Sequence, residues 1–129
     1  MPAPFDQLMT VTRTDRAGCP VLTVHGEVDL STGPRLSATM TEVLLHGGHS
    51  PVILDLSTVV FLSSSGLGQL VALDNESKLH DRQLRIVVGT GRAVVRPITA
   101  TCLDAVLAVF TTVDDALAAG HRGSASPPS

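Results

Sequence analysis

The sequence predicts an α/β domain with a mixed, mainly parallel sheet of about five strands packed with about four helices. Strand-like and helix-like segments alternate after an opening pair of strands. Several strand segments are short Val, Ile and Leu runs, typical of strands buried on both faces. Hydrophobic residues make up 43% of the chain but aromatic residues only 2%, so the core must be built from aliphatic side chains.

The chain opens with a predicted β-hairpin. Residues 8–12 and 21–25 alternate apolar with polar side chains, as half-buried strands do. Between them, Asp15, Gly18 and Pro20 indicate a turn. The two strands are therefore expected to pair antiparallel.

The first β–α unit follows. A helix is predicted to begin at Ser31 or Thr32, because Pro34 is tolerated in a first turn, and to end at Gly47 and Gly48. Residues 51–56 are almost wholly apolar and predict a buried central strand.

The rest of the chain repeats this alternation. A connection over 57–62 leads to a helix over 65–80 and then to a strand over 84–89.

The last elements are shorter. The helix predicted over 92–101 contains Pro97, which should kink or shorten it. A short strand over 107–110 precedes a closing helix over 113–119 that ends at Gly120.

The chain is expected to form one domain. A length of 129 residues suits a single modest core over residues 8–120. Residues 1–7 are assigned to an N-terminal tail, and the Gly/Ser/Pro-rich stretch 121–129 to a disordered C-terminal tail.

Charge and composition argue against several classes of partner. The net charge is −3, so no basic surface favours nucleic acid or anionic lipid, and the aromatic side chains that stack on bases are nearly absent. The apolar stretches are far shorter than the roughly 20 residues of a membrane span, and the N-terminus does not resemble a signal peptide. Cys19 and Cys102 are expected to be reduced thiols in a cytoplasmic protein, with a disulfide as the alternative.

The acidic segment Gly26-Glu27-Val28-Asp29 is predicted to be a loop after the second strand. Gly26 can end a strand where a side chain would crowd the turn, and Asp29 can accept hydrogen bonds from free amides of the following helix. The alternative is an acidic contact for a partner or for its bound metal.

A run of three serines, Ser63, Ser64 and Ser65, lies where the second long helix begins. Serine is a preferred N-cap. However, Gly66 and Gly68 follow in the first turns, and glycine costs a helix about 1 kcal/mol relative to alanine. Two interpretations stay open: a cap alone, or a site for modification or docking that needs close access to the backbone.

Other polar residues give weaker signals. His46 and His49 lie in a glycine turn and are expected to be solvated loop residues rather than a metal pair. Arg92 and Arg96 could bind an anion or an acidic partner, or form a solvated helix face. No G-x-S-x-G elbow or phosphate-binding G-x-x-x-x-G-K-[ST] loop is present, which argues against an enzyme.

Together the acidic segment and residues 55–68, Asp-Leu-Ser-Thr-Val-Val-Phe-Leu-Ser-Ser-Ser-Gly-Leu-Gly, resemble the STAS domain of bacterial anti-sigma factor antagonists. The resemblance runs from about Leu8 to Ala119. It implies the STAS fold and a non-enzymatic protein without a cofactor that binds an anti-sigma factor and so releases a sigma factor.

The resemblance also implies a switch. The anti-sigma factor of this family is often a serine kinase that phosphorylates the antagonist and breaks the complex, and a phosphatase resets it. By position the acceptor is Ser64, with Ser63 and Ser65 as alternative acceptors. The resemblance places the partner-binding residues at Glu27, Asp29, Ser63, Ser65, Gly66, Leu67 and Gly68. A monomer or weak dimer is expected.

One position departs from the family pattern. The family has Asp immediately before the phosphorylated serine, whereas this chain has Ser63. The departure removes a negative charge beside the acceptor and leaves three adjacent hydroxyls. The alternative function is therefore an unphosphorylated STAS subunit of a larger signalling or lipid-transport assembly.

Overall fold

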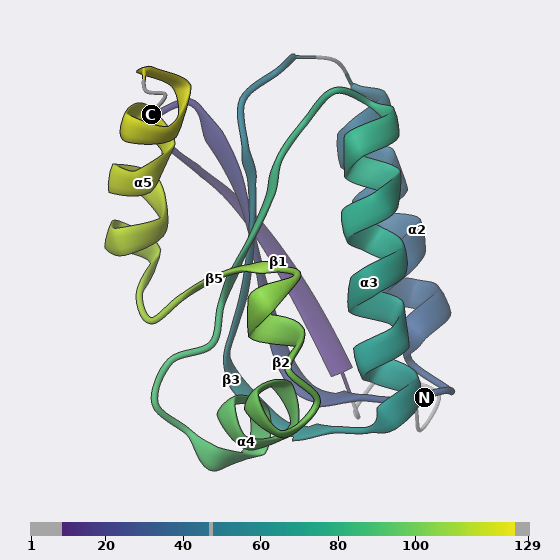
Figure 1. Cartoon of the computed structure of the whole chain (residues 1–129). Coiled ribbons are helices and arrows are strands. Elements are labelled where there is room, and N and C mark those ends of the chain that lie inside the picture. Colours follow the sequence, from purple (N-terminus) through teal and green to yellow (C-terminus); the bar gives the residue numbers. More distant parts are fainter. Residues whose placement is uncertain (1–8, 47, 126–129) are drawn as a thin grey trace.

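A five-stranded sheet forms the middle of the computed structural model, which describes residues 9–46 and 48–125 (Figure 1). The strands lie in sequence order: β1 (Met9–Arg16), β2 (Cys19–Val28), β3 (Val52–Leu62), β4 (Leu84–Val87) and β5 (Ala108–Phe110). β1 pairs with β2 antiparallel, and every other pair is parallel. The predicted mixed, mainly parallel sheet is confirmed.

Helices cover both faces of the sheet. The chain forms α2 (Gly33–Leu45), α3 (Ser64–Leu79), α4 (Arg92–Ala100), the short 3₁₀ helix η1 (Leu103–Ala105) and α5 (Val113–Ala125). α2 and α3 lie side by side on one face, α5 lies on the opposite face, and α4 lies near the end of β3 (Figure 1). None of the helices in the described ranges is long and apolar enough to cross a membrane.

The apolar run of β3 is explained by this layering. Leu54 and Leu56 belong to the large core between the sheet, α2 and α3. Ile53 points to the other face, into a smaller cluster that includes Ala116 of α5. Because both faces are covered, neither set of alternating side chains can be polar.

The first two strands extend further toward the hairpin turn than predicted. Asp15 and Pro20, expected in the turn, pair with each other as strand residues.

The boundaries predicted at the carboxyl end of the second strand and after residue 56 are also wrong. β2 continues through Gly26 to Val28, and residues 57–62, predicted as a connection, are the second half of β3. These two extensions pair with each other in parallel, for example Val28 with Leu62. Two register shifts interrupt the ladder, so alternating burial is lost after Leu56 and the period-2 pattern no longer signals a strand.

One helix prediction also needed correction, and one short helix was not predicted. α5 continues to Ala125 rather than ending at Gly120, because one glycine costs a helix only about 1 kcal/mol; the predicted disordered tail over 121–129 therefore overlaps its last turn. α4 spans nearly the predicted range 92–101, with Pro97 inside the helix, and ends at Ala100. The 3₁₀ helix η1 was not predicted. The predicted tail over 1–7 and the last four residues of the chain lie outside the described residues.

Candidate functional site

The carboxyl ends of β2 and β3 bring the acidic segment and the serine run together. Val28 pairs with Leu62, and the amide of Ser63 donates a hydrogen bond to the carbonyl oxygen of Val28 at 3.0 Å. Parallel strands end at the same edge of a sheet, which is why segments 35 residues apart meet here. We call this region the switch edge; it comprises residues 26–30 and 60–68.

Ser63 is the N-cap of α3. Its hydroxyl accepts a hydrogen bond from the amide of Gly66 at 3.1 Å and donates to the carbonyl oxygen of Val28 at 3.4 Å. Both functions of this hydroxyl are therefore used inside the fold. Ser63 satisfies one of the free amides that every helix N-terminus leaves.

Ser64 and Ser65 are different, since both are exposed on the first turn of α3. Within residues 9–46 and 48–125, their hydroxyls and backbone amides make no hydrogen bond. The two free amides and the helix dipole create a positive potential at this end, which favours an anionic group. Of the three serines, Ser64 and Ser65 thus offer accessible hydroxyls.

The two glycines of this turn have separate explanations. A Cβ atom on Gly66 would lie 2.5 Å from the carbonyl oxygen of Val28 and 2.8 Å from a methyl group of Leu62. Gly66 is therefore required by the chain's own packing. Gly68 is exposed and a Cβ there would meet nothing within 4 Å, so the fold does not demand glycine at this position.

Leu67 lies between these glycines. Its side chain is buried in the large core, so of the predicted contact residues it offers the least surface to a partner.

Asp29 organises the turn from β2 to α2. One carboxylate oxygen accepts hydrogen bonds from the Ser31 hydroxyl at 2.8 Å and from the amides of Ser31 and Thr32 at 3.0 and 3.1 Å. These bonds, above all the one from the Ser31 hydroxyl, hold the pKa of Asp29 below its ordinary value. Asp29 therefore accepts from backbone amides as predicted, but these amides belong to the turn ahead of α2 and not to the helix, whose N-cap is Thr32. Glu27 is half-buried and faces Phe61 across the ladder.

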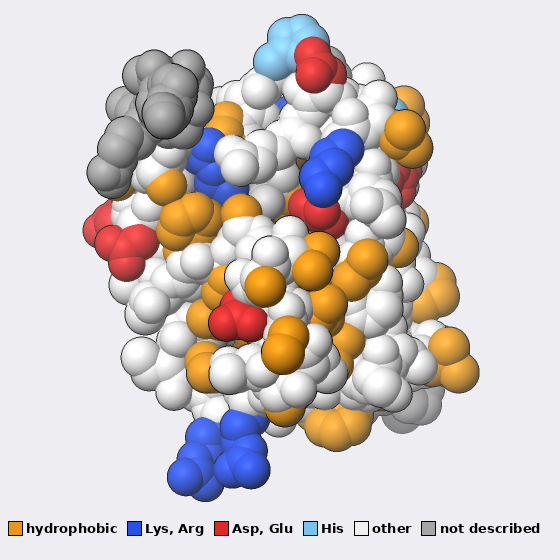
Figure 2. Space-filling model, in the orientation of Figure 1, with side chains coloured by type: hydrophobic (Ala, Val, Ile, Leu, Met, Phe, Trp, Pro, Cys, Tyr) orange, Lys and Arg blue, Asp and Glu red, His pale blue; other side chains and the backbone are white. Residues whose placement is uncertain are grey.

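Apolar residues of the switch edge were missed by the sequence analysis. Leu30, Val60 and Phe61 are large apolar side chains left exposed, Phe61 by 49%. Val60 and Phe61 also line a shallow groove with Arg92 and Arg96 of α4. Figure 2 shows basic side chains projecting from the bottom of the molecule, the end where Figure 1 places α4. The signal was the apolar pair Val60-Phe61 itself, which was assigned to a connection.

Comparison with known proteins gives consistent results. Residues 10–116 match the STAS domain family. The chain is 37% identical over 115 residues to the anti-sigma-F factor antagonist RsfB of Mycobacterium tuberculosis, covering 89% of this chain and 91% of that protein.

Solved structures agree with this. A crystal structure of an anti-sigma factor antagonist from Mycobacterium paratuberculosis has a TM-score of 0.79 and 33% identity, covering 88% of this chain and 95% of its own. The anti-sigma factor antagonist SpoIIAA in its unphosphorylated form has a TM-score of 0.68 at 15% identity, over 84% and 93% of the two chains, and shows the shared fold alone.

Proposed function

The chain belongs to the STAS domain family, and on that premise we propose that it is an anti-sigma factor antagonist, which binds an anti-sigma factor and so releases a sigma factor. The 37% identity to RsfB, along nearly the full length of both chains, supports this role. The observation that carries it is the exposed N-terminus of α3 beside the end of β2, where the hydroxyls of Ser64 and Ser65 make no hydrogen bond to any residue that the structure describes.

The partner surface is proposed to be the switch edge. Its polar part consists of Glu27, Asp29, Ser64, Ser65 and the open backbone at Gly68. Its apolar part is Leu30, Val60 and Phe61, which are solvated in the free protein. Protein interfaces combine apolar side chains, whose burial supplies binding energy, with polar groups that set the register.

Phosphorylation of Ser64 is proposed to switch this surface off. A phosphoserine adds about −1.5 to −2 charges at pH 7. At a helix N-terminus this charge is stabilising by about 0.3–1 kcal/mol, so the fold should persist. A partner fitted to the bare helix end would instead bury an uncompensated charge, which costs several kcal/mol. The phosphate is therefore expected to weaken binding of the partner and to leave the fold stable.

Ser63 is compatible with this switch although the family pattern has Asp there. Ser and Asp are both good N-caps, so Ser63 fulfils the same structural role without charge. Because its hydroxyl is held by Gly66 and Val28, Ser63 is the least available of the three acceptors. This geometry supports Ser64 as the acceptor and Ser65 as the alternative.

The remaining features of the proposal follow from the role. The kinase is the anti-sigma factor itself or a companion serine kinase, and a phosphoserine phosphatase restores the active form. The protein works by binding, without a cofactor, as a cytoplasmic monomer or weak dimer.

Incubation with the cognate anti-sigma kinase, ATP and magnesium, followed by mass spectrometry of the peptide over residues 61–78, tests the switch. We expect a single phosphate on Ser64, absent from Ser64→Ala and retained in Ser65→Ala. Binding of the anti-sigma factor with no phosphate on any serine would leave an antagonist without this switch. Neither binding nor phosphate would favour the alternative of a STAS subunit in a larger assembly.

A further inference from the structure

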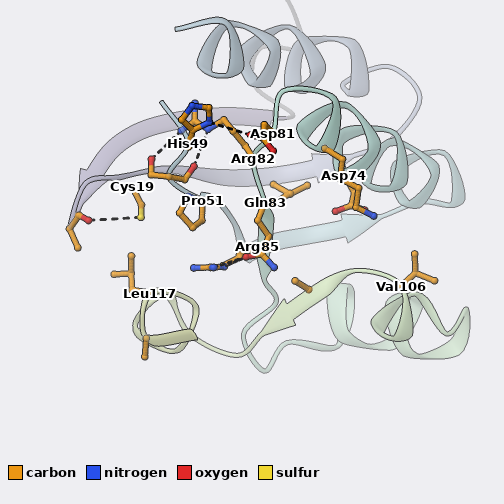
Figure 3. A pocket seen from close by; sticks show the side chains of 16 residues that line it. Cys19, His49, Pro51, Asp74, Asp81, Arg82, Gln83, Arg85, Val106 and Leu117 are labelled. Atoms are coloured by element: carbon orange, nitrogen blue, oxygen red, sulfur yellow. Dashed lines mark hydrogen bonds and ion pairs between the residues drawn. The ribbon is translucent and has the colours of Figure 1, made fainter. Parts of the chain in front are cut away.

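A second feature lies at the opposite end of the sheet from the switch edge. A cavity of about 1000 Å³ opens at the amino ends of β3, β4 and β5 (Figure 3). Its walls include Pro51 before β3, Leu84 at the start of β4 and Leu117 of α5. We call it the amino-edge cavity. The 11 residues of β3 lie between this cavity and Ser63.

The central residue of this cavity is Arg85, which is 3% exposed. Its Nε and Nη2 atoms both donate to the side-chain oxygen of Gln83, and Nη1 donates to the carbonyl oxygen of Ala116. A guanidinium has five N–H donors, so at least two remain unused. Figure 3 shows Arg85 among the residues that line the cavity.

No carboxylate pairs with Arg85 among the residues that the structure describes. The contrast with its neighbour is clear, because Lys78 contacts the buried Asp74 at 3.1 Å. Burial lowers the pKa of Arg85, yet an arginine stays charged in proteins. A buried charge without a counter-charge is unfavourable, so this position favours an incoming anion.

The rest of the cavity adds positive charge and apolar surface. Arg82, which is 6% exposed, lines it as well and donates hydrogen bonds to Ser50. Counting the lining side chains at neutral pH, Arg82, Arg85 and Lys78 outnumber the two carboxylates, Asp74 and Asp81. The apolar wall is formed by Leu84, Val106, Leu117 and several alanines.

We propose that the amino-edge cavity binds a small amphiphilic anion, that is, a carboxylate or phosphate monoester that carries an apolar chain. The anionic group takes the unused donors of Arg85, since a guanidinium matches carboxylate and phosphate oxygens in a two-point contact. The apolar chain lies against Leu84, Val106 and Leu117. No residue of the switch edge lines this cavity, and ligand binding here does not depend on the antagonist role.

Calorimetric titration of the full chain with octyl phosphate and sodium octanoate tests the proposal, with 1-octanol as the uncharged probe. We expect both anions to bind, and Arg85→Met to weaken them by at least about tenfold, as for the loss of a charged hydrogen bond. Arg92→Met, which removes an exposed arginine at the other end of the molecule, should bind as the unmodified chain does. Binding of 1-octanol as tight as that of octanoate, or an unchanged affinity in Arg85→Met, would overturn the proposal.

Alkylation of the cysteines of the unmodified chain gives a second test, which does not depend on whether Arg85→Met folds. Cys19 lines the cavity and is 9% exposed, whereas Cys102 is exposed outside it. Saturating octyl phosphate should slow alkylation of Cys19 by iodoacetamide severalfold and leave Cys102 unaffected. Equal rates at Cys19 with and without the anion would contradict a ligand in this cavity.

Discussion

The carbonyl oxygen of Val28 accepts two hydrogen bonds from Ser63, one from its amide at 3.0 Å and one from its hydroxyl at 3.4 Å. This contact fastens the end of β2 to the start of α3. The hydroxyl of Ser63 is therefore occupied by hydrogen bonds within the fold, whereas Ser64 and Ser65 are exposed.

Ser63→Ala should destabilise the fold by about 1 kcal/mol, because it removes an N-cap whose hydroxyl holds the amide of Gly66. Ser65→Ala is the matched control: its hydroxyl is exposed and makes no hydrogen bond within the described ranges, so a change within about 0.5 kcal/mol is expected. Urea denaturation followed by circular dichroism measures both free energies of unfolding. Equal stabilities would show that the cap contributes nothing.

Gly66→Ala and Gly68→Ala should act in opposite directions. A Cβ at Gly66 meets the backbone of Val28, which cannot move without breaking the ladder, so a loss of about 2 kcal/mol or more is expected. A Cβ at Gly68 meets only open space, and helix propensity should stabilise that variant by up to about 1 kcal/mol. Thermal unfolding distinguishes the two. Tolerance of alanine at Gly66 would mean that the close approach of α3 to β2 is not required.

Ser64→Ala should bind the anti-sigma factor and resist inactivation by its kinase, while Ser64→Asp should fold normally and bind about a hundredfold more weakly. The weaker binding is the cost of roughly 3 kcal/mol for a charge buried at the interface. Calorimetric titration against the purified partner gives the affinities, and urea denaturation checks the fold. Indistinguishable affinities for the two variants would refute the interface mechanism of the switch.

Acid should weaken the turn that Asp29 holds. Its pKa in the folded chain is lowered from the ordinary value of 3.8, so the unfolded state takes up a proton first as the pH falls. The stabilising contribution of Asp29 is therefore complete above the ordinary pKa of 3.8 and is lost as the pH falls through the lower pKa of the folded chain. Asp29→Asn removes the titrating group but keeps an acceptor oxygen. Its urea midpoint should fall less than that of the unmodified chain between about pH 5 and pH 3; parallel falls would exclude Asp29 as a source of the acid sensitivity.

The sequence by itself determined the fold class. The alternation of strands and helices, and the almost wholly apolar run 51–56, are local patterns that follow from covering a sheet on both faces. The strands and α-helices follow one another along the chain as predicted. The serine run was likewise visible, because a serine N-cap followed by two glycines conflicts with helix propensity and demands a reason.

Only the tertiary structure decided which residue does what. The clash that requires Gly66, the second half of β3, and the bonding that separates Ser63 from Ser64 all depend on Val28, about 35 residues away in the chain. The surroundings of Arg85, which has no carboxylate partner among the described residues, equally depend on which groups α5 and the neighbouring strands place around it. Local patterns report propensity and burial, but these contacts join segments that only the folded sheet brings together, and no local period encodes them.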